Sequence, residues 1–159
     1  SRVAELCHLF GCEIAAYDLF PKKNAPEYLH YGTLEEVLSK SDIVTLHCPL
    51  TEDSRNLINQ DRIAQMKKGA ILINAARGPI VDSKALADAL NSGYLRGAGV
   101  DVFEMEPPLP MDHPLLHSIN TIVTPHIAFA SDESMEIRAK IVFENIQKWM
   151  NKEQVNTIL

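Results

Sequence analysis

The chain alternates between short apolar runs rich in β-branched residues and longer stretches with helical periodicity. The short runs cover residues 12–18, 42–48, 70–76, 97–102 and 121–126. They are nearly continuous in apolar character, which is typical of strands covered on both faces of a sheet. A longer stretch places Val3, Leu6, Cys7 and Phe10 at i, i+3, i+4 and i+7. The alternation predicts repeated βα units and a doubly wound parallel α/β sheet.

Capping signals divide the helical stretches. Thr33 and Glu36 form a T-x-x-E capping box, while Asn59 and either Asp82 or Ser83 are further N-cap candidates. Glycines that can end helices are Gly11, Gly69 and Gly93. Each predicted helix therefore has a polar start, a glycine stop, or both.

Ser131 opens a long final helix with an apolar stripe. The stripe consists of Met135, Ala139, Val142, Ile146 and Trp149. Amphipathic packing is the usual reason for this period, so the stripe predicts a core or subunit contact rather than a cofactor site. Residues 1–150 are expected to form one partial domain, and residues 151–159 a C-terminal tail.

The composition indicates a globular domain. The chain has 159 residues, of which 46% are hydrophobic and 23% charged, so a mainly disordered chain is excluded. Its formal net charge of −6 disfavours nucleic acid as a partner. The apolar stretches are far shorter than the roughly 20 residues that cross a membrane. Cys7, Cys12 and Cys48 form no C-x-x-C motif and predict reduced thiols in a cytoplasmic protein.

Polar residues follow the predicted strands, at the edge where open α/β sheets bind their ligands. Asp18 ends the first strand, and it is either a turn residue or the acid that accepts hydrogen bonds from the adenosine ribose and favours NAD over NADP. Arg77 follows the third strand, beside Gly78, which permits a tight turn. Its guanidinium can bind a carboxylate through two hydrogen bonds, although a solvated surface arginine is the alternative.

The last two strands end in carboxylates and a histidine. Asp101, Glu104 and Glu106 follow the fourth strand, and two of the three need only be solvated. His126 ends the fifth strand, where a nearby carboxylate would make it a general acid/base, although a lone histidine is more often structural. His113 and His117 lie four residues apart, but Pro114 separates them and no third ligand is evident, so no metal site is predicted.

Together these motifs resemble the NAD-dependent D-isomer-specific 2-hydroxyacid dehydrogenases over residues 11–146. Glu106 follows Arg77 by 29 residues (106 − 77), and His126 follows Glu106 by 20 (126 − 106), close to the family's pattern. The resemblance implies a Rossmann-type NAD-binding domain that lacks its first strand and glycine-rich loop. The family's substrate domain is expected upstream, so this fragment alone should bind NAD poorly and catalyse little.

The resemblance implies a role for each site residue. Arg77 would hold the substrate carboxylate and polarise the keto oxygen, His126 would transfer the proton, and Glu106 would orient and stabilise the imidazolium. The implied NAD contacts are Asp18 at the ribose, Cys48, Pro49 and Ser54 around the adenine and nearby backbone, Ala75 and Ala76 at the nicotinamide ribose, Asp101 at the carboxamide, Ala128 in the nicotinamide pocket, and the catalytic Arg77 and His126.

The implied function is hydride transfer between NAD(H) and a D-2-hydroxy acid or 2-keto acid, by a homodimer joined through the nucleotide domain. The pair Ala128-Phe129 resembles the D-lactate and D-2-hydroxyisocaproate branch more than the branches with glycine there, such as the phosphoglycerate and glyoxylate/hydroxypyruvate enzymes. An NAD(H)-sensing interaction module, like the transcriptional corepressors that share this fold, is the alternative. A complete triad does not exclude it.

Overall fold

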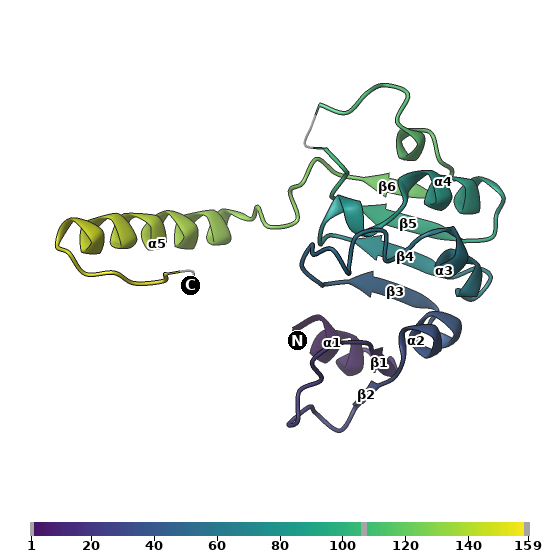
Figure 1. The fold of residues 1–159 in the computed structure, drawn as a ribbon, viewed down its shortest axis with the longest axis horizontal. Coiled ribbons are helices and arrows are strands. Elements are labelled where there is room, and N and C mark those ends of the chain that lie inside the picture. The colour runs from purple at the N-terminus through teal and green to yellow at the C-terminus, as the bar shows by residue number, and fades with distance from the viewer. Residues whose placement is uncertain (1, 106–107, 158–159) are drawn as a thin grey trace. The chain divides into compact units, whose positions relative to one another are not determined.

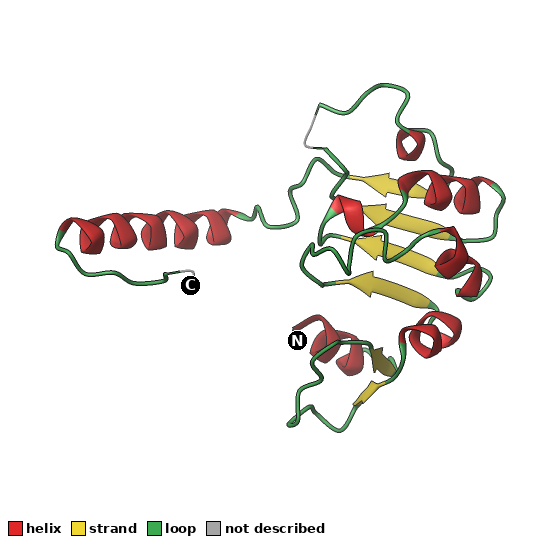
Figure 2. Cartoon of the chain, in the orientation of Figure 1, coloured by secondary structure: helices red, strands yellow, loops and turns green. Residues whose placement is uncertain are grey.

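The computed structural model describes residues 2–105 and 108–157 (Figures 1 and 2). Its strands are β1 (Ile14–Ala16), β2 (Leu29–Tyr31), β3 (Ile43–Leu46), β4 (Ile71–Asn74), β5 (Gly97–Val100) and β6 (Thr121–Val123). Its helices are α1 (Arg2–Leu9), α2 (Leu34–Lys40), α3 (Gln60–Gln65), α4 (Ser83–Asn91) and α5 (Asp132–Met150), with 3₁₀ turns η1 (Gly78–Ile80) and η2 (Pro114–Leu116). The chain divides into two compact units, Ser1–Pro125 and His126–Leu159.

Every pair of neighbouring strands is parallel, as predicted for an α/β fold of this class. The first unit holds a four-stranded sheet of order β3-β4-β5-β6 and a two-stranded sheet of β1 and β2. All five predicted strands are present, each shorter than its apolar run. Strand β2 was not predicted, because it lies outside any continuous apolar run: the polar His30 stands in its middle.

Within the first unit, the helices α2, α3 and α4 pack on one face of the four-stranded sheet. Residues of that face join α2, α3 and α4 in one hydrophobic core, with Leu72 of β4 fully buried at its centre. On the opposite face Ile43, Ile73 and Ile122 are 55%, 37% and 74% exposed. Within the first unit, coverage is thus present on one face, and coverage of the second face stays a prediction. The apolar runs supply side chains to both faces, but α2, α3 and α4 all join the core on one of them.

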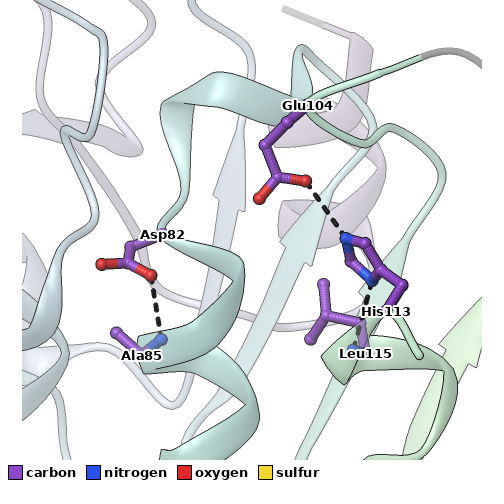
Figure 3. Close-up of polar contacts among 5 residues, drawn as sticks. All are labelled: Asp82, Ala85, Glu104, His113 and Leu115. Atoms are coloured by element: carbon purple, nitrogen blue, oxygen red, sulfur yellow. Dashed lines mark hydrogen bonds and ion pairs between the residues drawn. The ribbon is translucent and has the colours of Figure 1, made fainter. Parts of the chain in front are cut away.

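The helix caps match the predictions closely. The Thr33 hydroxyl accepts a hydrogen bond from the Glu36 N–H (3.2 Å), and the Glu36 carboxylate accepts one from the Thr33 N–H (2.9 Å). Of the two candidates for the start of α4, Asp82 is the cap, since its carboxylate accepts from the Ala85 N–H at 3.0 Å (Figure 3). Gly11, Gly69 and Gly93 all have positive φ values, as expected of residues that follow helices.

The long helix α5 forms most of the second unit. It begins with the predicted cap, where Ser131 and Ser134 exchange hydrogen bonds. None of its residues is buried, and Trp149 is 68% exposed. The apolar stripe thus contributes to no core within this unit, because the unit contains no second helix or sheet to pack on it. A subunit contact for the stripe, and the predicted division into residues 1–150 and 151–159, stay predictions. Among the described helices, none combines the length and the hydropathy needed to span a membrane.

Candidate functional site

The carboxyl ends of β3 and β4 enclose a cavity of about 380 Å³. Its lining consists of Leu46, His47, Cys48, Pro49, Ala75, Ala76 and Arg77. Five of these seven residues were assigned to the site from the sequence. The two alanines leave room beside the strand ends, and the arginine adds a positive charge. The cavity is thus a concave, partly polar pocket at the edge where open α/β sheets bind nucleotides.

Asn74 holds the turn that carries Arg77. This last residue of β4 is 1% exposed, and its amide accepts a hydrogen bond from the Ala76 N–H (3.1 Å) and donates one to the Arg77 carbonyl (3.0 Å). The exposed Arg77 guanidinium donates to the Ala76 carbonyl at 2.6 Å. A guanidinium has five N–H donors, and this contact uses one. Asn74 was not assigned to the site from the sequence, although a polar residue that ends a buried strand is a signal that points to it.

Gly78 allows the next segment to approach the chain that leaves β5. A Cβ atom on Gly78 would lie 1.8 Å from the Phe103 carbonyl oxygen, a distance that no side chain tolerates. The predicted reason for this glycine was a tight turn, whereas its φ is not positive. Gly78 does begin the 3₁₀ turn η1, and the structure adds a second reason for the glycine: two backbones meet there.

Asp101 lies just past the end of β5 and is 6% exposed. Its N–H donates to the Asn74 carbonyl at 2.9 Å, and its carboxylate accepts a hydrogen bond from the Thr124 hydroxyl at 2.5 Å. Burial and these bonds fix the carboxylate near the ends of β4 and β6. This is a suitable place for an acceptor of a carboxamide N–H, the role that the resemblance implies.

Asp18 and Cys48 are electrostatically coupled although they follow strands of different sheets. Burial raises the pKa of the Cys48 thiol, a backbone hydrogen bond opposes this, and the negative charge of Asp18 raises it further. Asp18 lines a second cavity of about 520 Å³, together with residues that include Tyr31 and Thr33. One oxygen of its carboxylate accepts from the Phe20 N–H at 2.8 Å, so Asp18 is also a turn residue. The turn role of Asp18 is therefore observed, and its role as the acceptor for the adenosine ribose stays a prediction.

Ser54 stabilises the loop that follows Cys48. This residue is 8% exposed, and its hydroxyl donates to the Pro49 carbonyl (2.8 Å) and accepts from the Thr51 N–H (2.7 Å). These hydrogen bonds fix the backbone of residues 49–54, a loop that begins at Pro49 in the lining of the first cavity.

His126 and Ala128 belong to the second unit and are described within it. His126 has a φ of 58°, in the left-handed region, where histidine is one of the more frequent residues other than glycine. The His126 ring meets the Phe129 ring edge to face, with the centroids 6.0 Å apart. The Arg138 guanidinium lies over the Phe129 ring, 5.3 Å from its centroid. Sparsely populated backbone conformations of this type cluster at active sites.

Glu106, the third predicted catalytic residue, lies outside the described residues. Close to it in the sequence, Glu104 pairs with the buried His113 at 3.2 Å (Figure 3). Sequence reasoning considered His113 only as a metal ligand. The described residues contain no group of three or more side chains suited to a metal ion, and the absence of a metal stays a prediction.

The comparisons with known proteins agree with the resemblance drawn from the motifs. The model of one protein family, described as "D-isomer specific 2-hydroxyacid dehydrogenase, NAD binding domain", matches residues 1–128. Its description names NAD as the nucleotide, as predicted for this chain.

Individual relatives point the same way. A putative 2-hydroxyacid dehydrogenase of Haemophilus influenzae is 48% identical over 77% of this chain and 40% of its own length. A glyoxylate reductase of Korarchaeum cryptofilum is 43% identical over 92% of this chain and 44% of its own length. A crystal structure of D-lactate dehydrogenase with NAD+ from Lactobacillus jensenii has a TM-score of 0.90 and 32% identity, and covers 99% of this chain and 51% of that one. The chain thus spans about half the length of the relatives that it matches.

Proposed function

The chain belongs to the family of D-isomer specific 2-hydroxyacid dehydrogenase NAD-binding domains, and from this membership we propose that the protein transfers a hydride between NAD(H) and a D-2-hydroxy acid or its 2-keto acid. The observation that carries the proposal is the cavity where Ala75, Ala76 and Arg77 meet Cys48 and Pro49. It combines space for a flat ring system with a cation that can bind a carboxylate.

The residues present suit NAD. The cavity lies at the carboxyl ends of two parallel strands, and the buried Asp101 carboxylate offers an acceptor beside it. The Asp18 carboxylate, electrostatically coupled to Cys48, is the acceptor proposed for the adenosine ribose hydroxyls. When bound, the reduced nicotinamide supplies the hydride for the substrate carbonyl carbon.

The chain's own residues perform the rest of the reaction. Arg77 binds the substrate carboxylate and places positive charge near the keto oxygen, where negative charge develops. His126 donates its proton to the developing alkoxide and accepts it again in the oxidative direction. Glu106 hydrogen-bonds the other ring nitrogen and stabilises the imidazolium. Asn74 acts through Arg77, because it fixes the turn from which the guanidinium extends.

Substitutions in the intact protein separate these roles. His126→Ala should remove most turnover of NADH with 2-keto acids while NADH binding stays nearly unchanged, and Asp18→Ala should mainly weaken NADH binding. Binding is measured by NADH fluorescence titration and turnover by absorbance at fixed enzyme concentration. The opposite pattern would overturn the assignment of roles. If the unmodified protein turned over no member of a panel of 2-keto acids but bound NADH, the NAD(H)-sensing interaction module would replace the enzyme as the function.

The proposal includes a cytoplasmic homodimer with no nucleic-acid or membrane partner. Support comes from the three free cysteines, the net charge of −6, and the exposed apolar side chains of α5, among them Phe143 and Trp149. Light scattering of the intact protein tests the dimer directly, since a monomer at micromolar concentration would contradict it.

A further inference from the structure

The loop that leaves β5 carries Glu104, which pairs with the buried His113 (Figure 3). The His113 side chain is 8% exposed, and its Nε2 lies 3.2 Å from a Glu104 carboxylate oxygen. Its Nδ1 accepts a hydrogen bond from the Leu115 N–H at 3.3 Å. Because Nδ1 is the acceptor, Nε2 carries the hydrogen in the neutral ring and donates it to Glu104. The His113 ring also meets Phe103 edge to face, with centroids 5.2 Å apart.

Ser83 completes the network from the helix side. It is the first residue of α4, is 7% exposed, and hydrogen-bonds the Glu104 carboxylate. Burial raises the pKa of Glu104, but hydrogen bonds from Ser83, from a backbone N–H and from His113 outweigh it, so the pKa lies below its usual value. The carboxylate is therefore ionised at neutral pH and receives hydrogen bonds from both segments.

The network involves Glu104, on the described chain that follows β5, and this chain contacts the segment that follows Arg77. Arg77 directly precedes Gly78, whose backbone touches that of Phe103 so closely that no Cβ fits between them. Glu106 follows Glu104 by two residues in the sequence. Ser83 and His113 thus both interact with Glu104, next to the close approach of Gly78 and Phe103.

We propose that Ser83, Glu104 and His113 are positioning residues that hold the chain leading to Glu106 against the segment of Arg77. The inference rests on the proposed function and adds three residues to it. A displacement of about 1 Å in a positioned group lowers turnover about 100-fold. Loosening this network should therefore reduce kcat and leave NADH binding intact, because none of the three side chains lines the nucleotide cavity.

The test uses a matched pair of variants of the intact protein. His113→Gln keeps an N–H donor near the position of Nε2, whereas His113→Asn keeps an acceptor near that of Nδ1 and loses the donor to Glu104. Both variants lose the ring contact with Phe103. We expect His113→Asn to lower kcat about 10-fold or more with an unchanged KM for NADH, and His113→Gln to retain most of kcat. The control is His117→Asn, since the ring of this exposed histidine hydrogen-bonds the Met111 carbonyl, at 2.6 Å, and the variant should retain full activity.

Other outcomes decide against the proposal. Equal kcat values for His113→Asn and His113→Gln, whether high or low, would mean that the donor to Glu104 has no positioning role. If His113→Asn does not fold, Glu104→Ala tests the same contact from the half-exposed partner, and an unchanged kcat there overturns the inference. Glu106→Gln separates the two levels: full turnover in that variant refutes the proposed role of Glu106, and with it this inference. If Glu106→Gln has low turnover but His113→Asn has normal activity, the positioning role of His113 is refuted while the proposed role of Glu106 stands.

Discussion

Both faces of the four-stranded sheet carry apolar side chains, but within the first unit they differ in packing. In β4, Leu72 is fully buried under the helices, while its neighbour Ile73 is 37% exposed on the other face. In β3 and β6 the exposed face carries Ile43 and Ile122. The comparison teaches that a continuous apolar run identifies a strand without revealing which face the chain itself covers.

Polar site residues lie where the covered side meets the carboxyl edge. Asn74 and Asp101 are almost completely buried there, and each forms hydrogen bonds within the protein. A buried polar group that loses its partner costs about 1–3 kcal/mol, so such residues have a strongly preferred arrangement. The packed face therefore fixes the geometry of the site, whereas the open face does not.

The largest difference is expected between Leu72→Ala and Ile73→Ala in the 159-residue chain. Leu72→Ala leaves a cavity in the core and should lower the free energy of unfolding by about 2–5 kcal/mol. Ile73→Ala should lower it by about 1 kcal/mol or less, because this side chain is partly exposed already. Urea denaturation followed by circular dichroism measures both. Equal losses would mean that the second face is covered in solution, and the contrast between the faces would fail.

A second contrast compares two glycines. Gly78→Ala forces a methyl group against the Phe103 backbone and should destabilise the chain by about 1–3 kcal/mol, since neither backbone can move freely. Gly99→Ala, in β5, places its methyl group 3.9 Å from the Ile73 side chain, an ordinary contact. We expect no loss there, or a gain of about 0.5 kcal/mol from reduced freedom of the unfolded chain. Thermal unfolding of both variants decides, and an unaffected Gly78→Ala would contradict the close backbone approach.

These contrasts indicate how far the sequence could predict the molecule. The apolar runs predicted five of the strands, and capping residues such as Thr33 and Asp82 predicted helix starts, because both signals depend on neighbours within a few residues. Strand β2 was missed because its short segment, Leu29-His30-Tyr31, is not a continuous apolar run. The stripe on α5 has helical periodicity, but periodicity does not identify the surface that covers it.

The candidate site shows the same limit. The cavity gathers Cys48, Pro49, Ala75, Ala76 and Arg77, all of which follow strand ends that the pattern located. The close approach of Gly78 and Phe103 joins residues 25 positions apart (103 − 78), and a sequence contains no direct signal for such a meeting. His113 was considered only as a metal ligand, because its partner Glu104 becomes evident only when the loop is folded.

The hydrogen bonds of the Glu104 carboxylate also predict that stability depends on pH. The pKa of Glu104 in the folded chain lies below its usual 4.5. Its ionised form therefore stabilises the fold fully above pH 4.5, and this contribution is lost as the pH falls through the lower folded value. Wild type should melt at a higher temperature than Glu104→Gln at pH 6, and the gap should shrink below about pH 4. A gap that is constant down to pH 3 would contradict the role of the Glu104 charge.

The smallest expected effect concerns the thiol at the edge of the cavity. Because burial and the charge of Asp18 raise the pKa of Cys48, little thiolate forms at pH 8, and the residue should react with iodoacetamide more slowly than the exposed Cys12. Asp18→Asn removes one of the two causes and should accelerate the labelling of Cys48 by a factor of about 2–3, with no change at Cys12. Mass spectrometry of the two peptides measures both rates in the same sample. An unchanged Cys48 rate would mean that Asp18 exerts no charge effect across the boundary between the two sheets, and the two-stranded sheet would then contribute nothing to the electrostatics of the cavity.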